Sequence, residues 1–195
     1  MPQRPSVVVI GRVSGLHQNL MGSAAWIVLR VFLELLSGKR RPQDIPASQP
    51  LFALTFVFYL AASAGLTAVA VDWPTAVKAA LADAVVLPAF VLTVLWLRNF
   101  TARFLQALTA MAGVGALFAL AAIPPFMVTV LMPESPLAAL ASVLVLVMFI
   151  WNVLVLGHIL RHALTIAFPA GVLVAMTYVA LSMVATEFLV PEVLA

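Results

Sequence analysis

Long apolar runs separated by short polar gaps occupy the chain after residue 50. A helix needs roughly 20 apolar residues to cross the hydrocarbon core of a bilayer, and each run has about that length. We therefore predict an all-α fold: a polytopic transmembrane helical bundle with five spans in residues 51–195, preceded by a cytoplasmic segment in residues 1–50. The predicted spans cover roughly residues 51–71, 77–97, 104–132, 136–160 and 166–189.

Prolines and capping residues predict where several spans begin and end. As one helix, the third run would measure about 43 Å at 1.5 Å per residue, which exceeds a hydrocarbon core of about 30 Å. Because proline lacks a backbone N–H, we expect Pro124 and Pro125 to end or kink this helix. Ser135 is a candidate N-cap, with Pro136 as the first helical residue. Residues 72–75 are expected to form a turn that carries an interfacial tryptophan.

The N-terminal segment has its own pattern. Apolar residues recur at helical spacing over residues 20–37, whereas Arg30 and Glu34 lie four apart on another face. Two charges within the run favour an amphipathic helix in the headgroup plane rather than a span. A basic, proline-bearing connector follows. We expect this region to contact anionic lipids or partner proteins, and its candidate contact residues are Trp26, Lys39, Arg40 and Arg41.

Composition excludes several classes of protein. Apolar residues make up 65% of the chain and charged residues 9%, whereas soluble domains are nearer 45–50% and about 25%. The net charge of +3 rests on too few Lys and Arg for a nucleic-acid surface, so no nucleic-acid partner is expected. The chain has no cysteine, which excludes disulfides and thiolate chemistry. No phosphate-binding, dinucleotide-binding or hydrolase motif is present, so we expect neither an enzyme nor a cofactor.

The basic residues predict the orientation. Nine of the ten Lys and Arg residues lie in the N-terminal segment and in the second and fourth gaps between spans, with Lys78 the exception on the other side. Because basic loops stay in the cytoplasm, the N-terminus is predicted inside and the C-terminus outside. We expect an integral protein of a bacterial inner membrane.

Two polar residues within the spans are candidates for function. Asp83 lies about one turn inside the second predicted span, and intramembrane ionisable groups are functional suspects by default. The alternative is a hydrated first-turn carboxylate that the helix dipole keeps ionised and that anchors the span. We expect the alternative, and therefore that Asp83→Asn leaves folding nearly unchanged. Asn152 lies in the fourth span, where an amide is expected to hydrogen-bond between helices.

A histidine pair forms the remaining candidate. His158 and His162 are four residues apart and share a helix face, a spacing that can present two imidazoles to one metal. A third ligand is missing from the pattern, so we expect no metal. The pair is instead expected near the headgroups, with the gap between the fourth and fifth spans around Arg161 and His162.

The layout resembles the Yip1-domain family of small membrane proteins. An amphipathic piece, Trp26 to Leu36, precedes a basic connector and five closely spaced spans, and residues 150–164 are similar to the family's fourth span and basic turn. The Asp-Leu-Tyr-Gly-Pro segment of eukaryotic members is absent. The resemblance implies a five-span fold with an outside C-terminus, and it carries no functional residue over to this chain.

Three functions follow from these patterns. The first is a non-enzymatic membrane protein that organises lipids or partner membrane proteins, including copies of itself. The second is a small secondary transporter or channel, which should bring polar groups together near the middle of the bilayer. The third is an accessory subunit of a larger membrane complex. The sequence predicts the architecture and leaves the choice among these functions open.

Overall fold

The computed structural model describes Arg30, Phe32, Glu34 and residues 45–191. Within these residues the chain forms helices and no strand. Five helices are long and apolar enough to cross a membrane, which confirms the predicted all-α bundle of an integral membrane protein. They are α2 (Gln49–Thr67), α3 (Trp73–Leu97), α4 (Phe104–Leu131), α5 (Pro136–Leu164) and α6 (Phe168–Leu189), and a short 3-10 helix η2 (Thr101–Arg103) leads into α4.

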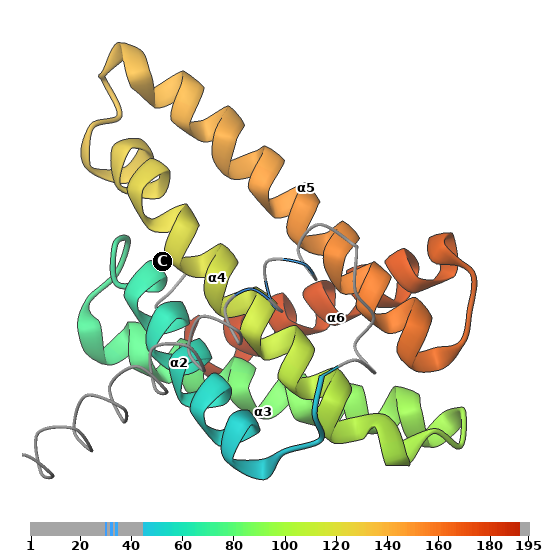
Figure 1. Cartoon of the computed structure of the whole chain (residues 1–195). Helices are drawn as coiled ribbons and strands as arrows, with labels where there is room; N and C mark the ends of the chain where they lie inside the picture. Colours follow the sequence, from blue (N-terminus) through green and yellow to red (C-terminus); the bar gives the residue numbers. More distant parts are fainter. Residues whose placement is uncertain (1–29, 31, 33, 35–44, 192–195) are drawn as a thin grey trace, which may run out of the picture.

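The five helices are neighbours in a closed order that differs from their order in the chain. Helix α4 packs between α2 and α5, α6 packs between α5 and α3, and α3 packs against α2. Figure 1 shows α4 and α5 side by side, with their connecting loop far from the loop that joins α3 to α4. The core centres on the first half of α4, which is buried without a break from Ala107 to Val114.

Capping explains where the helices begin. Ser48 and Asp72 are the N-caps of α2 and α3, and their side chains accept hydrogen bonds from the backbone N–H groups of Leu51 and Thr75. Hydrogen bonds from Thr75 hold the pKa of the exposed Asp72 carboxyl below its usual range. Ser135 caps α5 and Pro136 is its first residue, so that prediction is confirmed.

Four predicted boundaries are wrong. Residues 73–75 belong to the first turn of α3 rather than to a separate turn, because Asp72 caps the helix there. Helix α2 ends at Thr67, four residues before the predicted end of the first span. Of the two outcomes predicted for Pro124 and Pro125, an end or a kink, the end is wrong, because α4 continues to Leu131. Membrane helices tolerate such prolines because neighbouring helices and hydroxyl side chains satisfy the freed backbone groups.

The fourth correction concerns the loop between α5 and α6. Arg161 and His162 lie inside the last turn of α5, which ends at Leu164. Arg103 of η2 reaches this end and donates to the carbonyl oxygens of His162 and Ala163 at 3.3 and 2.9 Å and to the Thr165 hydroxyl at 3.0 Å. A cation at a helix C-terminus satisfies free carbonyls and offsets the helix dipole, so the helix extends past the predicted end.

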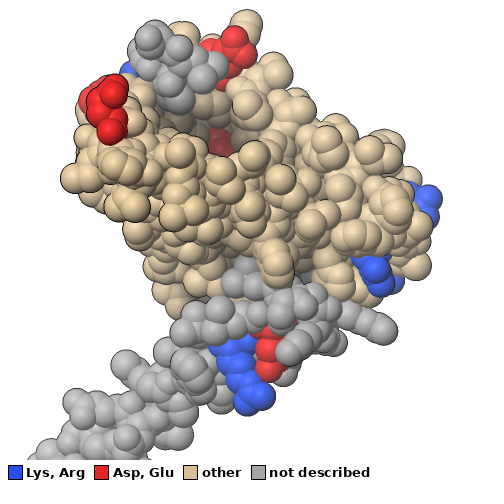
Figure 2. All heavy atoms as spheres, turned by 90° about the horizontal axis from the view of Figure 1, so that it is seen from above, with Lys and Arg blue, Asp and Glu red and all other residues tan. Residues whose placement is uncertain are grey.

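The charged residues separate toward the two ends of the bundle. Arg98, Arg103 and Arg161 lie at the end that holds the α3–α4 and α5–α6 loops, whereas Asp72, Glu134 and Glu187 lie at the end that holds the α2–α3 and α4–α5 loops. Figure 2 shows a body that is mostly free of charge, with most of the basic and acidic side chains on different sides of it. The structure thus places the basic loops together, as the alternation along the sequence predicts.

Only three residues of the predicted amphipathic helix over residues 20–37 are described. Arg30, Phe32 and Glu34 are helical, and Arg30 pairs with Glu34 at 2.9 Å in an exposed ion pair. The Phe32 ring is buried and lies against Gly113 of α4, where any side chain would collide with it. This part of the apolar stripe therefore packs on the bundle itself.

Candidate functional site

The position of Asp83 differs from the sequence-based expectation. Helix α3 begins at Trp73, so Asp83 is its eleventh residue and lies about 15 Å along the helix from its start. The prediction of a first-turn carboxylate is therefore wrong. The helix dipole acts mainly on the first and last turns, and it does not account for a carboxylate at this depth in the helix.

The Asp83 carboxylate accepts hydrogen bonds from three hydroxyl groups on two other helices. Tyr178 of α6 donates to Oδ1 at 2.9 Å, Ser182 of α6 donates to the same oxygen, and Tyr59 of α2 donates to Oδ2. The two tyrosine oxygens lie 3.4 Å apart. Asp83, Tyr59, Tyr178 and Ser182 are hereafter called the Asp83 cluster. It joins α2, α3 and α6 at one point.

Packing holds the two tyrosines in place. Tyr59 and Tyr178 are each 7% exposed, and each is the eleventh residue of its helix, far from either end. The Tyr178 ring lies 5.5 Å from the Phe90 ring of α3, a separation typical of attractive aromatic pairs. Their hydroxyl groups are therefore fixed toward Asp83, while Asp83 itself is half-buried.

This arrangement matches the hydrogen-bonding capacity of a carboxylate. An ionised carboxylate only accepts hydrogen bonds, so three hydroxyl donors compensate its charge within the bundle. When a proton binds, one carboxyl oxygen becomes a donor, and at least one hydroxyl must turn to another acceptor. Proton binding at Asp83 would thus change the contacts that tie α3 to α2 and α6.

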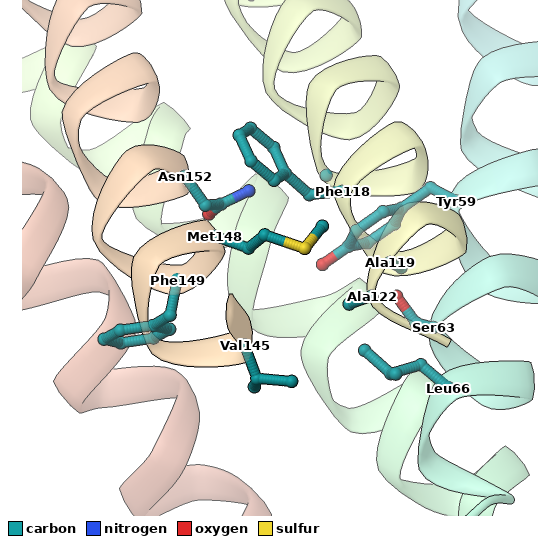
Figure 3. Close-up of a pocket in the computed structure, with 11 residues that line it drawn as sticks. Tyr59, Ser63, Leu66, Phe118, Ala119, Ala122, Val145, Met148, Phe149 and Asn152 are labelled. Atoms are coloured by element: carbon teal, nitrogen blue, oxygen red, sulfur yellow. The ribbon is translucent and has the colours of Figure 1, made fainter. Parts of the chain in front are cut away.

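A pocket of about 260 Å³ lies beside the Asp83 cluster, between α2, α4 and α5. Figure 3 shows Tyr59 and Ser63 on one side of it and the Asn152 amide pointing into it from the other. Tyr59 belongs to both the pocket wall and the cluster. The structure thus brings Asp83 and Asn152 near the same region of the bundle, although they are 69 residues apart in the chain.

The histidine pair lies elsewhere. His158 and His162 are in the last two turns of α5, and their rings meet edge to face with centroids 4.7 Å apart. The backbone carbonyl of His162 accepts from Arg103, which makes this pair part of the basic end of the bundle. The absence of a bound metal at the pair stays a prediction. Trp26, Lys39, Arg40 and Arg41 lie outside the described residues, so their predicted lipid or partner contacts are untested.

The sequence alone did not predict which hydroxyl groups bond to Asp83. Tyr59, Tyr178 and Ser182 are 24, 95 and 99 residues from Asp83. One signal was available: the chain has two tyrosines, and both lie inside apolar runs where a hydroxyl needs a partner. No protein-family model, curated protein or solved structure matches this chain, so the site stands on its geometry.

Proposed function

We propose that this integral membrane protein is a small, non-enzymatic transporter in which Asp83 binds and releases a proton. The observation that carries the proposal is the convergence of three hydroxyl donors from two helices on one carboxylate in a third. Intramembrane carboxylates are costly and mark ion and proton pathways by default. The transporter hypothesis requires polar groups from several helices to meet, and this cluster supplies that feature.

A proton fits the cluster better than a metal cation does. Each of the three hydroxyl groups lies within hydrogen-bonding reach of the carboxylate and can donate to it without a cation. Hard cations take six or more oxygen ligands, whereas the cluster offers one carboxylate and three hydroxyls. Pro88 adds a further feature one turn along α3, because it has no N–H to donate to the carbonyl of Ala84. That carbonyl belongs to the residue after Asp83 in the chain and lacks its usual helical donor.

Infrared difference spectroscopy of the protein in lipid films tests proton binding. Acidification should produce a carboxylic-acid C=O band that Asp83→Asn removes. Glu134→Gln changes an exposed loop carboxylate and should leave this band in place.

Vesicles loaded with a pH-sensitive dye test whether protons cross the membrane. A membrane potential should drive proton uptake faster in protein-containing vesicles than in empty ones, and Asp83→Asn should return the rate to that of empty vesicles. Identical spectra and rates for wild type and Asp83→Asn would reject the proposal.

A second function, the organisation of partner membrane proteins, is favoured by the surface of α5. Ala141 is the only buried residue between Pro136 and Asn152, a stretch in which every residue is described, and large apolar side chains such as Leu140 and Val143 are 67% and 58% exposed. Lipid or a partner helix can cover such a face. Similarity to the Yip1-domain family would support this second function. That similarity is a proposal that rests on the layout of the sequence.

A further inference from the structure

The pocket beside the Asp83 cluster has a composition of its own. Eleven residues of α2, α4 and α5 line it, and no charged side chain is among them. Three of the lining residues are polar, namely Tyr59, Ser63 and Asn152, and the others are apolar or glycine. Its volume of about 260 Å³ is several times the roughly 30 Å³ that one water molecule occupies in the liquid. The space is therefore that of an organic molecule rather than of a single bridging water.

We propose that this pocket binds one uncharged amphiphile, an apolar molecule with a single hydroxyl or carbonyl group. A charged ligand would lose its hydration without an opposite charge in the wall, which is costly. A polar atom on the ligand would find a partner in the Asn152 amide, which points into the pocket and can both donate and accept hydrogen bonds.

The space comes from small residues on α4. Gly115, Ala119 and Ala122 face it at intervals of four and three residues, which places them on one face of the helix. A methyl group on Gly115 would stand only 2.9 Å from the Tyr59 ring, so this glycine lets the ring pack against α4. Phe118, Met148 and Phe149 supply apolar contact for the ligand.

The ligand reaches the pocket from the bilayer. The pocket is partly open, and Phe149 in its wall is 48% exposed on the apolar surface of α5. A lipid acyl chain could enter by the same route. Such a chain has no polar atom along its length and would leave the Asn152 amide without a ligand partner, whereas an alcohol or ketone provides one. The ligand is therefore a free amphiphile rather than a lipid tail.

Photolabelling with a diazirine-bearing octanol tests the site in the full chain, reconstituted in vesicles. Label should appear on pocket residues and be displaced by octanol. Ala122→Phe fills the pocket and should abolish the labelling of pocket residues. Ala121→Phe adds the same ring at an exposed position on α4 and should leave that labelling unchanged. Asn152→Leu should weaken displacement by octanol roughly three- to fifteen-fold, the range expected for one hydrogen bond in a membrane protein, and leave displacement by octane unchanged.

Each arm of the experiment has a result that overturns the proposal. Equal labelling of Ala122→Phe and Ala121→Phe would show that the label marks the lipid-facing surface. If octane and octanol displaced the label equally strongly, the pocket would be a crevice for acyl chains that does not recognise a polar group. Asn152→Leu replaces the amide with an apolar side chain of similar shape and provides a second variant if Ala122→Phe does not fold. The site does not require proton movement: labelling that persists in Asp83→Asn, together with unchanged proton uptake, would reject the proposed function and leave the pocket standing.

Discussion

At the scale of single residues, both tyrosines of the chain bind the one aspartate that lies within a span. Hydrogen bonds between membrane helices contribute about 0.6 kcal/mol on average and up to about 1.7 kcal/mol, because the unfolded chain in the membrane also finds partners. We expect Tyr178→Phe to lower the free energy of unfolding by an amount in this range. The matched control is Thr177→Val, at the exposed position next to Tyr178, where the hydroxyl bonds only to its own helix.

A double-mutant cycle measures the contact itself. Tyr178→Phe should cost less in an Asp83→Asn background than in the wild type, since the charged acceptor has gone. Denaturing-detergent titration of the purified variants supplies the four free energies. Costs that add fully would show that the Tyr178 hydroxyl acts through another partner, such as the Tyr59 hydroxyl 3.4 Å away, rather than through Asp83.

Sequence reasoning at this scale found the carboxylate and missed its environment. An acidic residue in an apolar run is visible without any structure, so Asp83 was a candidate from the start. The position of Asp83 along α3 depends on where this helix begins. Because Asp72 is the N-cap, α3 begins at Trp73, four residues before the predicted Val77. The three hydroxyl partners depended on which helices are neighbours. Neither local spacing nor composition contains that information.

At the scale of helices, close packing between α5 and α6 rests on two glycines. A methyl group on Gly157 would stand 2.7 Å from Val172 Cγ2 and 2.8 Å from its Cα, and one on Gly171 would collide with the carbonyl oxygen of Gly157. We expect Gly157→Ala and Gly171→Ala each to lower the free energy of unfolding by about 1–3 kcal/mol, the usual cost of overpacking. Denaturing-detergent titration checks this.

Gly65 on α2 provides the matched control for this prediction. The nearest atom to a methyl group there is Ile123 Cδ1 at 3.9 Å, an ordinary contact, so Gly65→Ala should be tolerated or slightly stabilising. Equal costs at all three positions would show that the close contacts at Gly157 and Gly171 are not the cause. Two glycines on α4 have another role, since Gly113 and Gly115 leave room for the rings of Phe32 and Tyr59.

Local signals predicted the five helices well and their ends unevenly. Ser135 with Pro136 marked the start of α5, because a cap and a first-turn proline act within a few residues. The extra turn of α5 was mispredicted because it depends on a side chain from another part of the chain. Arg103 donates to carbonyl oxygens at the end of α5 that an isolated helix would leave free.

At the scale of the whole molecule, the alternation of basic and acidic gaps along the chain becomes two oppositely charged ends, and this could be predicted from the sequence. Successive spans place successive loops at alternate ends, so only the positions of the spans were needed. The order in which the helices pack could not be predicted in the same way. The helices are apolar on all sides, and no single face of any of them identifies its neighbours.

The absence of cysteine from the chain allows a direct test of which end faces the cytoplasm. Ala102 in η2 and Glu134 before α5 are both exposed and lie at opposite ends, so Ala102→Cys and Glu134→Cys report on the two sides. Because Arg98, Arg103 and Arg161 lie at the η2 end, the positive-inside rule places that end in the cytoplasm. A membrane-impermeant maleimide added to intact cells should therefore label Glu134→Cys and spare Ala102→Cys, and both should react once the membrane is opened. Labelling of Ala102→Cys alone in intact cells would reverse the orientation, and Asp83 would then meet a proton arriving from outside through the basic half of the bundle rather than through the acidic half.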